Sequence, residues 1–180
     1  MTSYIYEDHL ETERLITRKL ILEDDKAWST FFEDQECVKY LPDYHIEDNL
    51  ARAKHWVERQ INRYENKLFG LQMLTDKQNK EFVGMCGLIT QDVDGIKEIE
   101  IGYHLFKKHW GKGYASEAAK LFREYAFKNN LSPSVISIIH VDNIRSQKVA
   151  VANGMIREKR HTWNNIDAYI YRITNNDTPL

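Results

Sequence analysis

Residues 107–116 (KKHWGKGYAS) constrain the fold of this chain more than any other stretch. They contain two glycines, three lysines and no acid, and they lie between a strand-like run at 99–106 and a helix-like run that begins near Ala115. Gly111 and Gly113 allow backbone turns that are closed to other residues, and they leave no Cβ in the way of a ligand. A helix after such a loop presents free N–H groups and the positive end of its dipole to an anion. The segment therefore predicts a strand–loop–helix unit that holds a phosphate group.

Length and composition predict one domain. The chain has 180 residues, 42% of them hydrophobic, and a formal net charge of −2. This near-neutral charge gives no argument for a nucleic-acid or membrane partner. The positive charge is local, because residues 107–128 carry six Lys or Arg against two Glu. We expect residues 1–180 to form a single domain with its core at about 11–174 and polar tails at both ends.

The cysteines, the histidines and the lack of long apolar stretches argue against metal-binding, disulfide-linked and membrane-spanning classes of protein. Cys37 and Cys86 are isolated, which argues against a zinc site and a disulfide framework, and the seven histidines show no ligand spacing, so no metal is expected. Cys86 reads best as a buried strand residue. The N-terminus lacks an apolar core of signal-peptide length, and no stretch approaches a membrane span. A cytoplasmic setting is the expectation.

Hydrophobic periodicity predicts a mixed α/β (α+β) domain. Alternating or apolar runs predict strands at 13–22, 68–75, 81–90, 96–105, 135–141, 155–163 and 166–174. Helical spacing predicts a helix opened by the acids at 23–25, then helices at 46–64, from 115 to the break at 132–133, and at 143–153. We expect a mostly antiparallel sheet of six or seven strands flanked by about four helices.

Two common nucleotide-binding loops fit the glycine segment poorly. A Walker loop needs two glycines separated by four residues and followed by Lys and Ser or Thr, a frame that Gly111 and Gly113 do not provide. A Rossmann fingerprint needs a third glycine where Ser116 stands, in a βαβ unit early in the domain. Here the loop follows a predicted meander and lies past the middle of the chain. A nucleotide-binding regulatory module therefore stays a remote alternative.

A third loop type matches better. Residues 108–113 (KHWGKG) resemble the acyl-CoA loop of the GCN5-related N-acetyltransferase (GNAT) family, roughly Gln/Arg-x-x-Gly-x-Gly/Ala, with Lys108 at the first position. Residues 100–105 (EIGYHL) and 143–155 (NIRSQKVAVANGM) are similar to that family's fourth strand and its later Asn-x-x-Ser helix. Residues 11–15 (ETERL) resemble the opening of the branch that contains ribosomal-protein-alanine acetyltransferases. The resemblance spans about 11–174 and implies a GNAT-like fold.

The resemblance implies a set of donor contacts. The pyrophosphate of CoA would be bound by the backbone N–H groups of Gly111, Lys112, Gly113, Tyr114 and Ala115 and by the Ser116 hydroxyl. Lys108 and Lys112 could add charge-assisted contacts. Acetyl-CoA would lie where the fourth and fifth strands splay apart, with its thioester carbonyl polarised by backbone N–H groups near Tyr103, His104 and Leu105. Asn143 is predicted to be a helix N-cap, and the resemblance implies that it also contacts the pantetheine arm.

Two residues are the catalytic candidates. Glu100 stands on the strand face opposite Ile99 and Ile101, where a carboxylate could remove the proton of an attacking ammonium; the alternative is a solvent-facing strand residue. Many family members protonate the leaving thiolate with a tyrosine at the position that Ala150 occupies here. Ser146 could instead hydrogen-bond the sulfur; the alternative is a helix-surface serine.

These features predict an N-acetyltransferase that moves an acetyl group from acetyl-CoA to a primary amine by direct attack. The amine could be a protein N-terminus or a small molecule, and the enzyme a monomer or homodimer. Tyr40, Tyr44 and Trp163 are candidates for lining an acceptor cleft, and the acidic runs at 23–25 and 33–34 would suit a cationic acceptor if they lie there. Because Ala150 replaces the tyrosine, the alternative is a non-catalytic acyl-CoA-binding sensor or scaffold.

Overall fold

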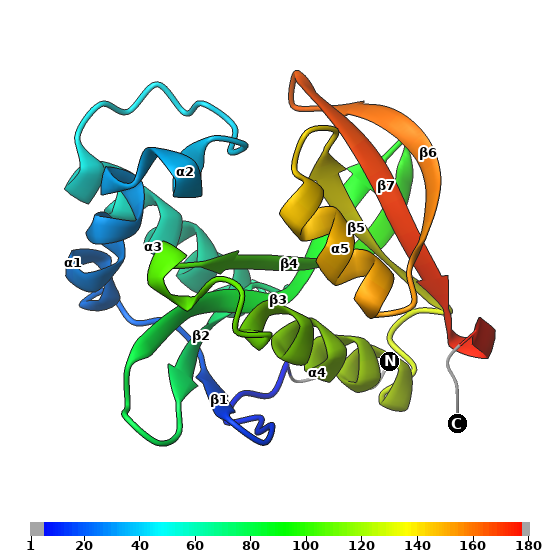
Figure 1. Cartoon of the computed structure of the whole chain (residues 1–180), viewed down its shortest axis with the longest axis horizontal. Coiled ribbons are helices and arrows are strands. Elements are labelled where there is room, and N and C mark those ends of the chain that lie inside the picture. The colour runs from blue at the N-terminus through cyan, green and yellow to red at the C-terminus, as the bar shows by residue number, and fades with distance from the viewer. Residues whose placement is uncertain (1–5, 178–180) are drawn as a thin grey trace.

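The computed structural model describes residues 6–177, and its core is one seven-stranded sheet (Figure 1). The strand order is β1-β2-β3-β4-β5-β7-β6, and every neighbouring pair is antiparallel except β4–β5. The strands are β1 (Leu15–Arg18), β2 (Leu71–Asp76), β3 (Phe82–Val93), β4 (Ile96–Leu105), β5 (Ser134–His140), β6 (Ile156–Trp163) and β7 (Ile166–Thr174). The predicted mixed, mostly antiparallel sheet is confirmed.

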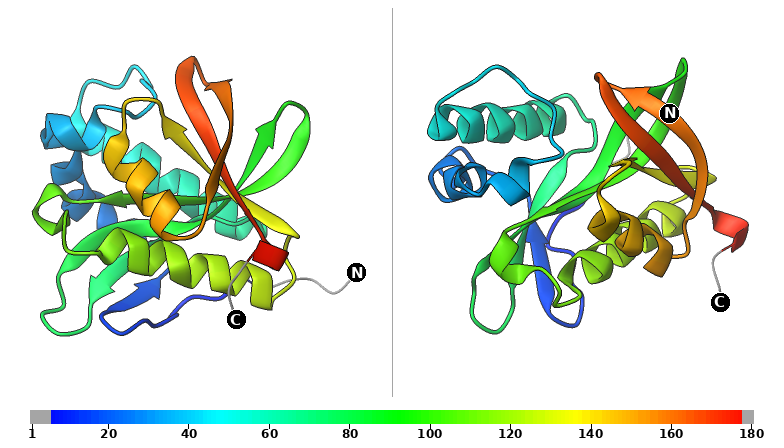
Figure 2. Two further views of the ribbon diagram at one scale, coloured as in Figure 1. Left: turned by 45° about the vertical axis from the view of Figure 1, so that its right-hand side comes forward. Right: turned by 45° about the horizontal axis from the view of Figure 1, so that its top comes forward.

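Helices cover both faces of the sheet (Figure 2). The α-helices are α1 (Asp24–Ser29), α2 (Gln35–Val38), α3 (Asn49–Glu65), α4 (Tyr114–Lys128) and α5 (Ile144–Ala152). Single 3-10 turns are formed by Thr30–Glu33, Lys107–His109 and Asn175–Asp177. The four predicted helices are present. The one-turn helix α2 was not predicted, because four residues are too few to show a helical period.

Capping and apolar spacing explain the two long helices. Asp48 begins α3 by accepting a hydrogen bond from the Ala51 N–H at 2.7 Å, and Trp56 and Val57 are buried on its inner face. In α4, Ala118 and Phe122 are fully buried one turn apart. The helices therefore lie on opposite sides of the sheet with their apolar stripes inward.

The sheet separates two apolar clusters. The larger includes Phe122 and lies under α4, and the second surrounds Trp28, whose ring stacks on Phe31 at 4.2 Å. Tyr6 is buried, and its hydroxyl accepts a hydrogen bond from the Leu88 N–H at 3.2 Å. The core therefore begins before residue 11, where the sequence had placed its boundary.

The first strand is shorter than the predicted run at 13–22. Its regular pairing ends at Arg18, whose guanidinium binds the Asp24 carboxylate at 2.6 and 2.8 Å. The same carboxylate accepts a hydrogen bond from the Ile21 N–H at 2.9 Å, so the chain turns into α1 instead of continuing the ladder.

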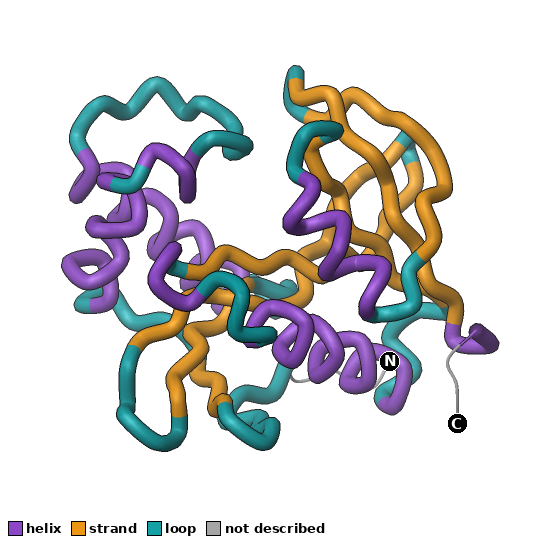
Figure 3. The backbone as a smooth tube through the Cα atoms, viewed as in Figure 1, coloured by secondary structure: helices purple, strands orange, loops and turns teal. Residues whose placement is uncertain are grey.

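β4 and β5 form the one parallel pair of the described sheet, and they separate almost at once (Figure 3). Only Glu100 and Ile136 are in register between them. Beyond this pair, toward their carboxyl ends, the strands diverge and leave an opening in the sheet. That opening is where the candidate site lies.

Candidate active site

The glycine loop has the backbone form that its sequence predicted. Gly111 and Gly113 adopt φ angles of 73° and 81°, in the left-handed region that favours glycine. Gly113 is also the N-cap of α4, and no side chain caps this end of the helix. The first N–H groups of α4 therefore remain available to an anion.

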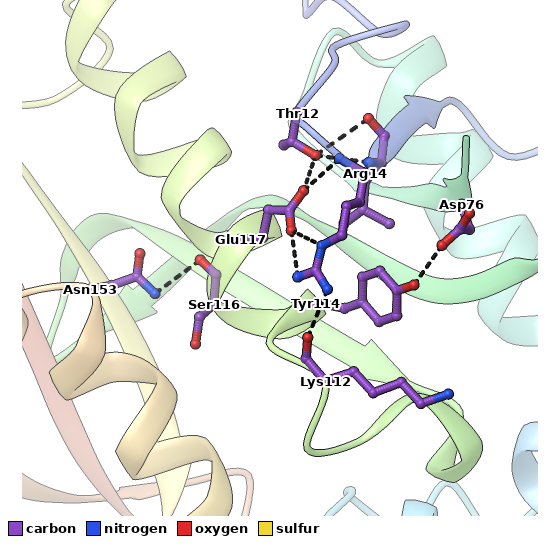
Figure 4. Close-up of polar contacts among 9 residues, drawn as sticks. Thr12, Arg14, Asp76, Lys112, Tyr114, Ser116, Glu117 and Asn153 are labelled. Carbon is purple, nitrogen blue, oxygen red and sulfur yellow. Dashed lines mark hydrogen bonds and ion pairs between the residues drawn. The ribbon is translucent and has the colours of Figure 1, made fainter. Parts of the chain in front are cut away.

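A polar network holds the loop from the side away from the cleft (Figure 4). The Arg14 guanidinium donates to Glu117 Oε2 from Nε at 2.7 Å and to the Lys112 carbonyl oxygen from Nη1 at 2.9 Å. Glu117 also accepts from the Thr12 hydroxyl at 2.5 Å and from the Arg14 N–H at 2.9 Å. The Tyr114 hydroxyl donates to Asp76 at 2.5 Å. Because side chains of the segment before β1, of α4 and of the end of β2 make these contacts, the loop's shape does not require the cleft-facing amides.

The loop lysines point elsewhere. The Lys108 ammonium lies 3.3 Å from the Glu81 carboxylate, and its side chain is 61% exposed. Neither Lys108 nor Lys112 is among the described residues that line the cleft. Side-chain charge from these two residues is thus not directed at the site, and the backbone carries the loop's anion-binding capacity.

One continuous cleft of about 510 Å³ connects the loop, the β4–β5 opening and α3. It brings together most of the predicted site residues, namely Glu100, Tyr103, His104, Leu105, Gly111, Gly113, Tyr114, Ala115, Ser116, Asn143 and Ser146. Tyr40, Tyr44 and Trp163 line it as well, as the sequence suggested. The acidic runs at 23–25 and 33–34 do not, so they give no support to a cationic acceptor.

Glu100 is buried at the point where the two strands separate. Its Oε2 accepts a hydrogen bond from Gln91 Nε2 at 2.6 Å, and its Oε1 accepts one from the Ile138 N–H at 3.3 Å. Burial raises the pKa of Glu100, and these two hydrogen bonds together with the charge of Arg63 oppose the rise. The alternative of a solvent-facing strand residue is therefore wrong, since only 8% of Glu100 is exposed.

The unpaired edge of β4 supplies amides to the opening. The Phe106 N–H donates to the Val83 carbonyl, and hydrogen-bonded pairs alternate along an antiparallel ladder. The amides of Tyr103 and Leu105 therefore face the β5 side, where no strand pairs with them, and that of His104 faces β3. Of the three backbone N–H groups predicted to polarise the thioester carbonyl, only those of Tyr103 and Leu105 face the opening.

The side chains of Tyr103 and Asn143 organise the start of α5. The Tyr103 hydroxyl donates to the Ser146 carbonyl oxygen at 2.9 Å, and burial raises the pKa of Tyr103. Asn143 is the N-cap, and its side chain accepts from the Ser146 N–H at 3.2 Å. Ala150 is buried in the core. Ser146 is half-buried in the cleft wall, so it is not a fully exposed helix-surface serine.

His104 forms part of the wall on the α3 side. Its ring lies edge-on to Trp56 at 4.9 Å and to Phe31 at 6.3 Å. Burial lowers the pKa of His104 to about 4, so the imidazole is neutral at physiological pH. It contributes an uncharged surface on β4, the strand that also carries Glu100.

The chain was also compared with known proteins. The model of the acetyltransferase (GNAT) domain family matches residues 14–156. The Bacillus subtilis protein YkkB, itself uncharacterised, is 30% identical over 159 residues, covering 86% of this chain and 90% of YkkB. Among solved structures, Mycobacterium smegmatis RimJ in complex with CoA-disulfide has a TM-score of 0.78 at 16% identity, covering 92% of this chain and 84% of RimJ. A ribosomal-protein alanine acetyltransferase of Vibrio fischeri has a TM-score of 0.71 at 17% identity, covering 94% and 98%.

The chain therefore belongs to the GNAT acetyltransferase family, an N-acetyltransferase family that uses acetyl-CoA. Within residues 6–177, no three His, Cys, Asp or Glu side chains are grouped closely enough to hold a metal ion. None of the helices in this part of the chain is both long and apolar enough to span a bilayer.

Sequence reasoning missed several residues of the site. Gln91, which donates to Glu100, lies on β3, and Arg59 and Arg63 of α3 line the cleft across from it. The two arginines are one helical turn apart, a spacing that could have been noticed. A polar helix face looks the same in sequence whether it meets solvent or a cleft.

We predict that Glu117→Gln weakens the support of the loop. Partial burial opposes ionisation of Glu117, but hydrogen bonds from Thr12 and Arg14 outweigh it and lower the pKa of Glu117. A lowered pKa stabilises the folded state above the ordinary glutamate range, and this contribution is lost as pH falls below about 4.3. We expect a loss of about 1 kcal/mol in unfolding free energy at pH 7, measured by urea denaturation, which shrinks in acid.

Glu124→Gln is the matched control on the same helix. Its carboxylate is 54% exposed and lies 3.8 Å from Lys120 and 3.5 Å from Arg123. An equal loss for both variants, or a Glu117 effect independent of pH, would contradict the assigned network.

Proposed function

We propose that this protein acetylates a primary amine by direct attack on acetyl-CoA, with Glu100 as general base. The observation that carries the proposal is a buried carboxylate at the separation of β4 and β5, in one cleft with an uncapped helix N-terminus. A phosphate-binding end and a proton-accepting group thus share one space. Transfer of an acetyl group to an amine needs both.

The donor half fits a CoA pyrophosphate. The left-handed glycines leave room beside the loop, since a Cβ at Gly111 would meet nothing within 4 Å. Amides of 111–115 and the Ser116 hydroxyl would bind the phosphates, and Asn143 is near enough in the same wall to bind the arm that follows. When bound, acetyl-CoA supplies the acetyl group as a reactive thioester.

Groups of the protein would polarise the thioester carbonyl, remove the proton of the ammonium and stabilise the leaving sulfur. The amides of Tyr103 and Leu105 would donate to the carbonyl oxygen of the acetyl group as negative charge develops there. Glu100 would accept the proton of the ammonium, directly or through a water, so that the neutral amine attacks. With no tyrosine at Ala150, Ser146 would donate a hydrogen bond to the sulfur as the thiolate leaves, and the thiolate would take up the proton that the attacking nitrogen loses when the amide forms.

Release of CoA in the presence of amines tests the function. We expect an amine-dependent release of free thiol, measured with a thiol reagent over a panel of small amines and N-terminal peptides. A sensor or scaffold would bind acetyl-CoA with no release for any amine.

We predict that Gly113→Asp abolishes CoA binding in titration calorimetry. The substitution strains a φ angle of 81°, and its Cβ would lie 3.3 Å from the Arg14 guanidinium, where a carboxylate would compete with Glu117 and disturb the loop that would hold the pyrophosphate. Gly95→Asp is the matched control, because Gly95 has a φ angle of 78° in the β3–β4 hairpin, with open space around it. Normal affinity in the Gly113 variant, or an equal loss in the Gly95 variant, would count against the loop assignment.

We predict that Glu100→Gln lowers turnover by about a hundredfold or more, the usual size of a general-base effect. CoA affinity should hardly change, because Glu100 lies away from the loop. Burial disfavours the charged carboxylate, so thermal stability should be retained. Unchanged turnover at neutral pH would remove Glu100 from the mechanism.

We predict that Gln91→Met shifts the acid limb of the pH–rate profile to higher pH. The amide of Gln91 donates to the ionised form of Glu100 at 2.6 Å, so its loss removes a contact that holds the pKa down. Turnover on the plateau of the profile, above the acid limb of each enzyme, should be close to wild type. A profile that does not move would show that the acid limb belongs to another group.

A further inference from the structure

The described lining of the whole cleft carries more positive than negative charge. Its cationic side chains are Arg59, Arg63, Arg145 and Lys148, and its carboxylates are Glu36 and Glu100. Glu36 already binds Arg145 at 3.2 Å. Glu100 is engaged by an amide side chain and a backbone N–H.

Of the three cations other than Arg145, Lys148 is exposed, whereas Arg59 and Arg63 are held half-buried without a carboxylate partner among the described residues. Arg59 donates to the Tyr44 hydroxyl at 2.8 Å, and Arg63 has one long contact of 3.5 Å to the Phe69 carbonyl oxygen. Within residues 6–177, neither guanidinium has a carboxylate at ion-pairing distance. Both arginines are half-buried, and they stand one turn apart on the cleft face of α3.

This arrangement is unfavourable unless an anion joins it. Burial and the neighbouring Arg59 charge lower the pKa of Arg63, and the opposing charge of Glu100 does not compensate for them, so the charged form of Arg63 is disfavoured in the cleft without a further anion. Half-buried cations are normally paired, and the planar guanidinium donates two parallel hydrogen bonds to a carboxylate or phosphate. Both arginines belong to α3 and not to the glycine loop.

We propose that the acceptor is a small primary amine that carries a carboxylate or phosphate group, which Arg59 and Arg63 bind while the amine faces Glu100. This inference rests on the proposed acetyl transfer and names its substrate class. A zwitterion matches the cleft at both ends, with its cation at the carboxylate and its anion at the arginines. A purely cationic amine would place its charge next to two unpaired guanidinium groups.

A binding experiment tests the anionic contact without turnover. With the protein saturated by CoA, N-acetylphenylalanine and N-acetylphenethylamine, which differ in the carboxylate, are titrated by calorimetry. We expect the carboxylate to improve affinity at least about tenfold. Arg63→Gln should remove that difference, whereas Arg52→Gln should keep it. Arg52 lies on the same helix, and its guanidinium stands over the Phe32 ring at 5.5 Å, outside the cleft lining.

A turnover experiment distinguishes the two anions. Phenylalanine is compared with phenethylamine, and O-phosphoethanolamine with ethanolamine, as acceptors for the wild-type enzyme. We expect the anionic member of one pair to be favoured, and its kcat/KM to fall about ten- to a hundredfold in Arg63→Gln. Arg63→Gln also removes a charge that lowers the pKa of Glu100, so both members of a pair can lose rate, and the test is the preference for the anionic member, which should fall about tenfold or more. The pair that shows the preference identifies carboxylate or phosphate as the group recognised.

The two proposals fail in different ways. Equal binding and equal turnover within both pairs, with amines still acetylated, would overturn the anionic acceptor and leave the acetyl transfer standing. Anion-dependent binding that requires Arg63, with no thiol released for any acceptor, would support the arginine site and overturn the transfer. If Arg63→Gln does not fold, Arg63→Lys keeps the charge but loses the paired donors, and the matched acceptors still decide with wild-type enzyme.

Discussion

The separation of β4 and β5 at Glu100 is the constraint on which the rest of the site depends. These strands form the one parallel junction in the described sheet, and a single registered pair joins the β1–β4 half to the β5–β7–β6 half. Past that pair, the Ile138 amide finds its acceptor in the Glu100 carboxylate instead of the β4 backbone. The opening that results exposes the β4 amides and leaves space for a ligand between the halves.

The two sides of the glycine loop have different roles: side chains hold it on one side, and its backbone amides face the cleft on the other. Thr12 and Arg14, which precede β1, bind Glu117 in the first turn of α4, and Tyr114 contacts the end of β2 through Asp76. Because these contacts lie behind the loop, its cleft-facing amides need no internal partner. A preformed arrangement of donors avoids an ordering cost when an anion binds. The positive φ of the glycines and this external support act together.

The sequence predicted what is encoded locally and missed what depends on distant partners. The alternation around Glu100, the glycine loop and the Asn143 cap are local patterns, and each reappears in the structure. The direction of the Lys108 side chain depends on Glu81 in the turn between β2 and β3, so no local pattern could reveal it. The role of α3 depends on which face meets the cleft, a property of packing that helical spacing alone does not contain.

The hydrogen bond from the Ile138 amide to Glu100 links the protonation state of Glu100 to the contact between β4 and β5. A carboxylate is a stronger hydrogen-bond acceptor than a neutral carboxyl group, so uptake of a proton weakens the contact to β5. With Glu100 as the base, each catalytic cycle would briefly weaken this hydrogen bond between β4 and β5, the strands that join the two halves of the sheet. The separation of β4 and β5 would then depend on the charge of the Glu100 carboxylate. The β5 backbone at Ile138 would shift each time that Glu100 takes up a proton.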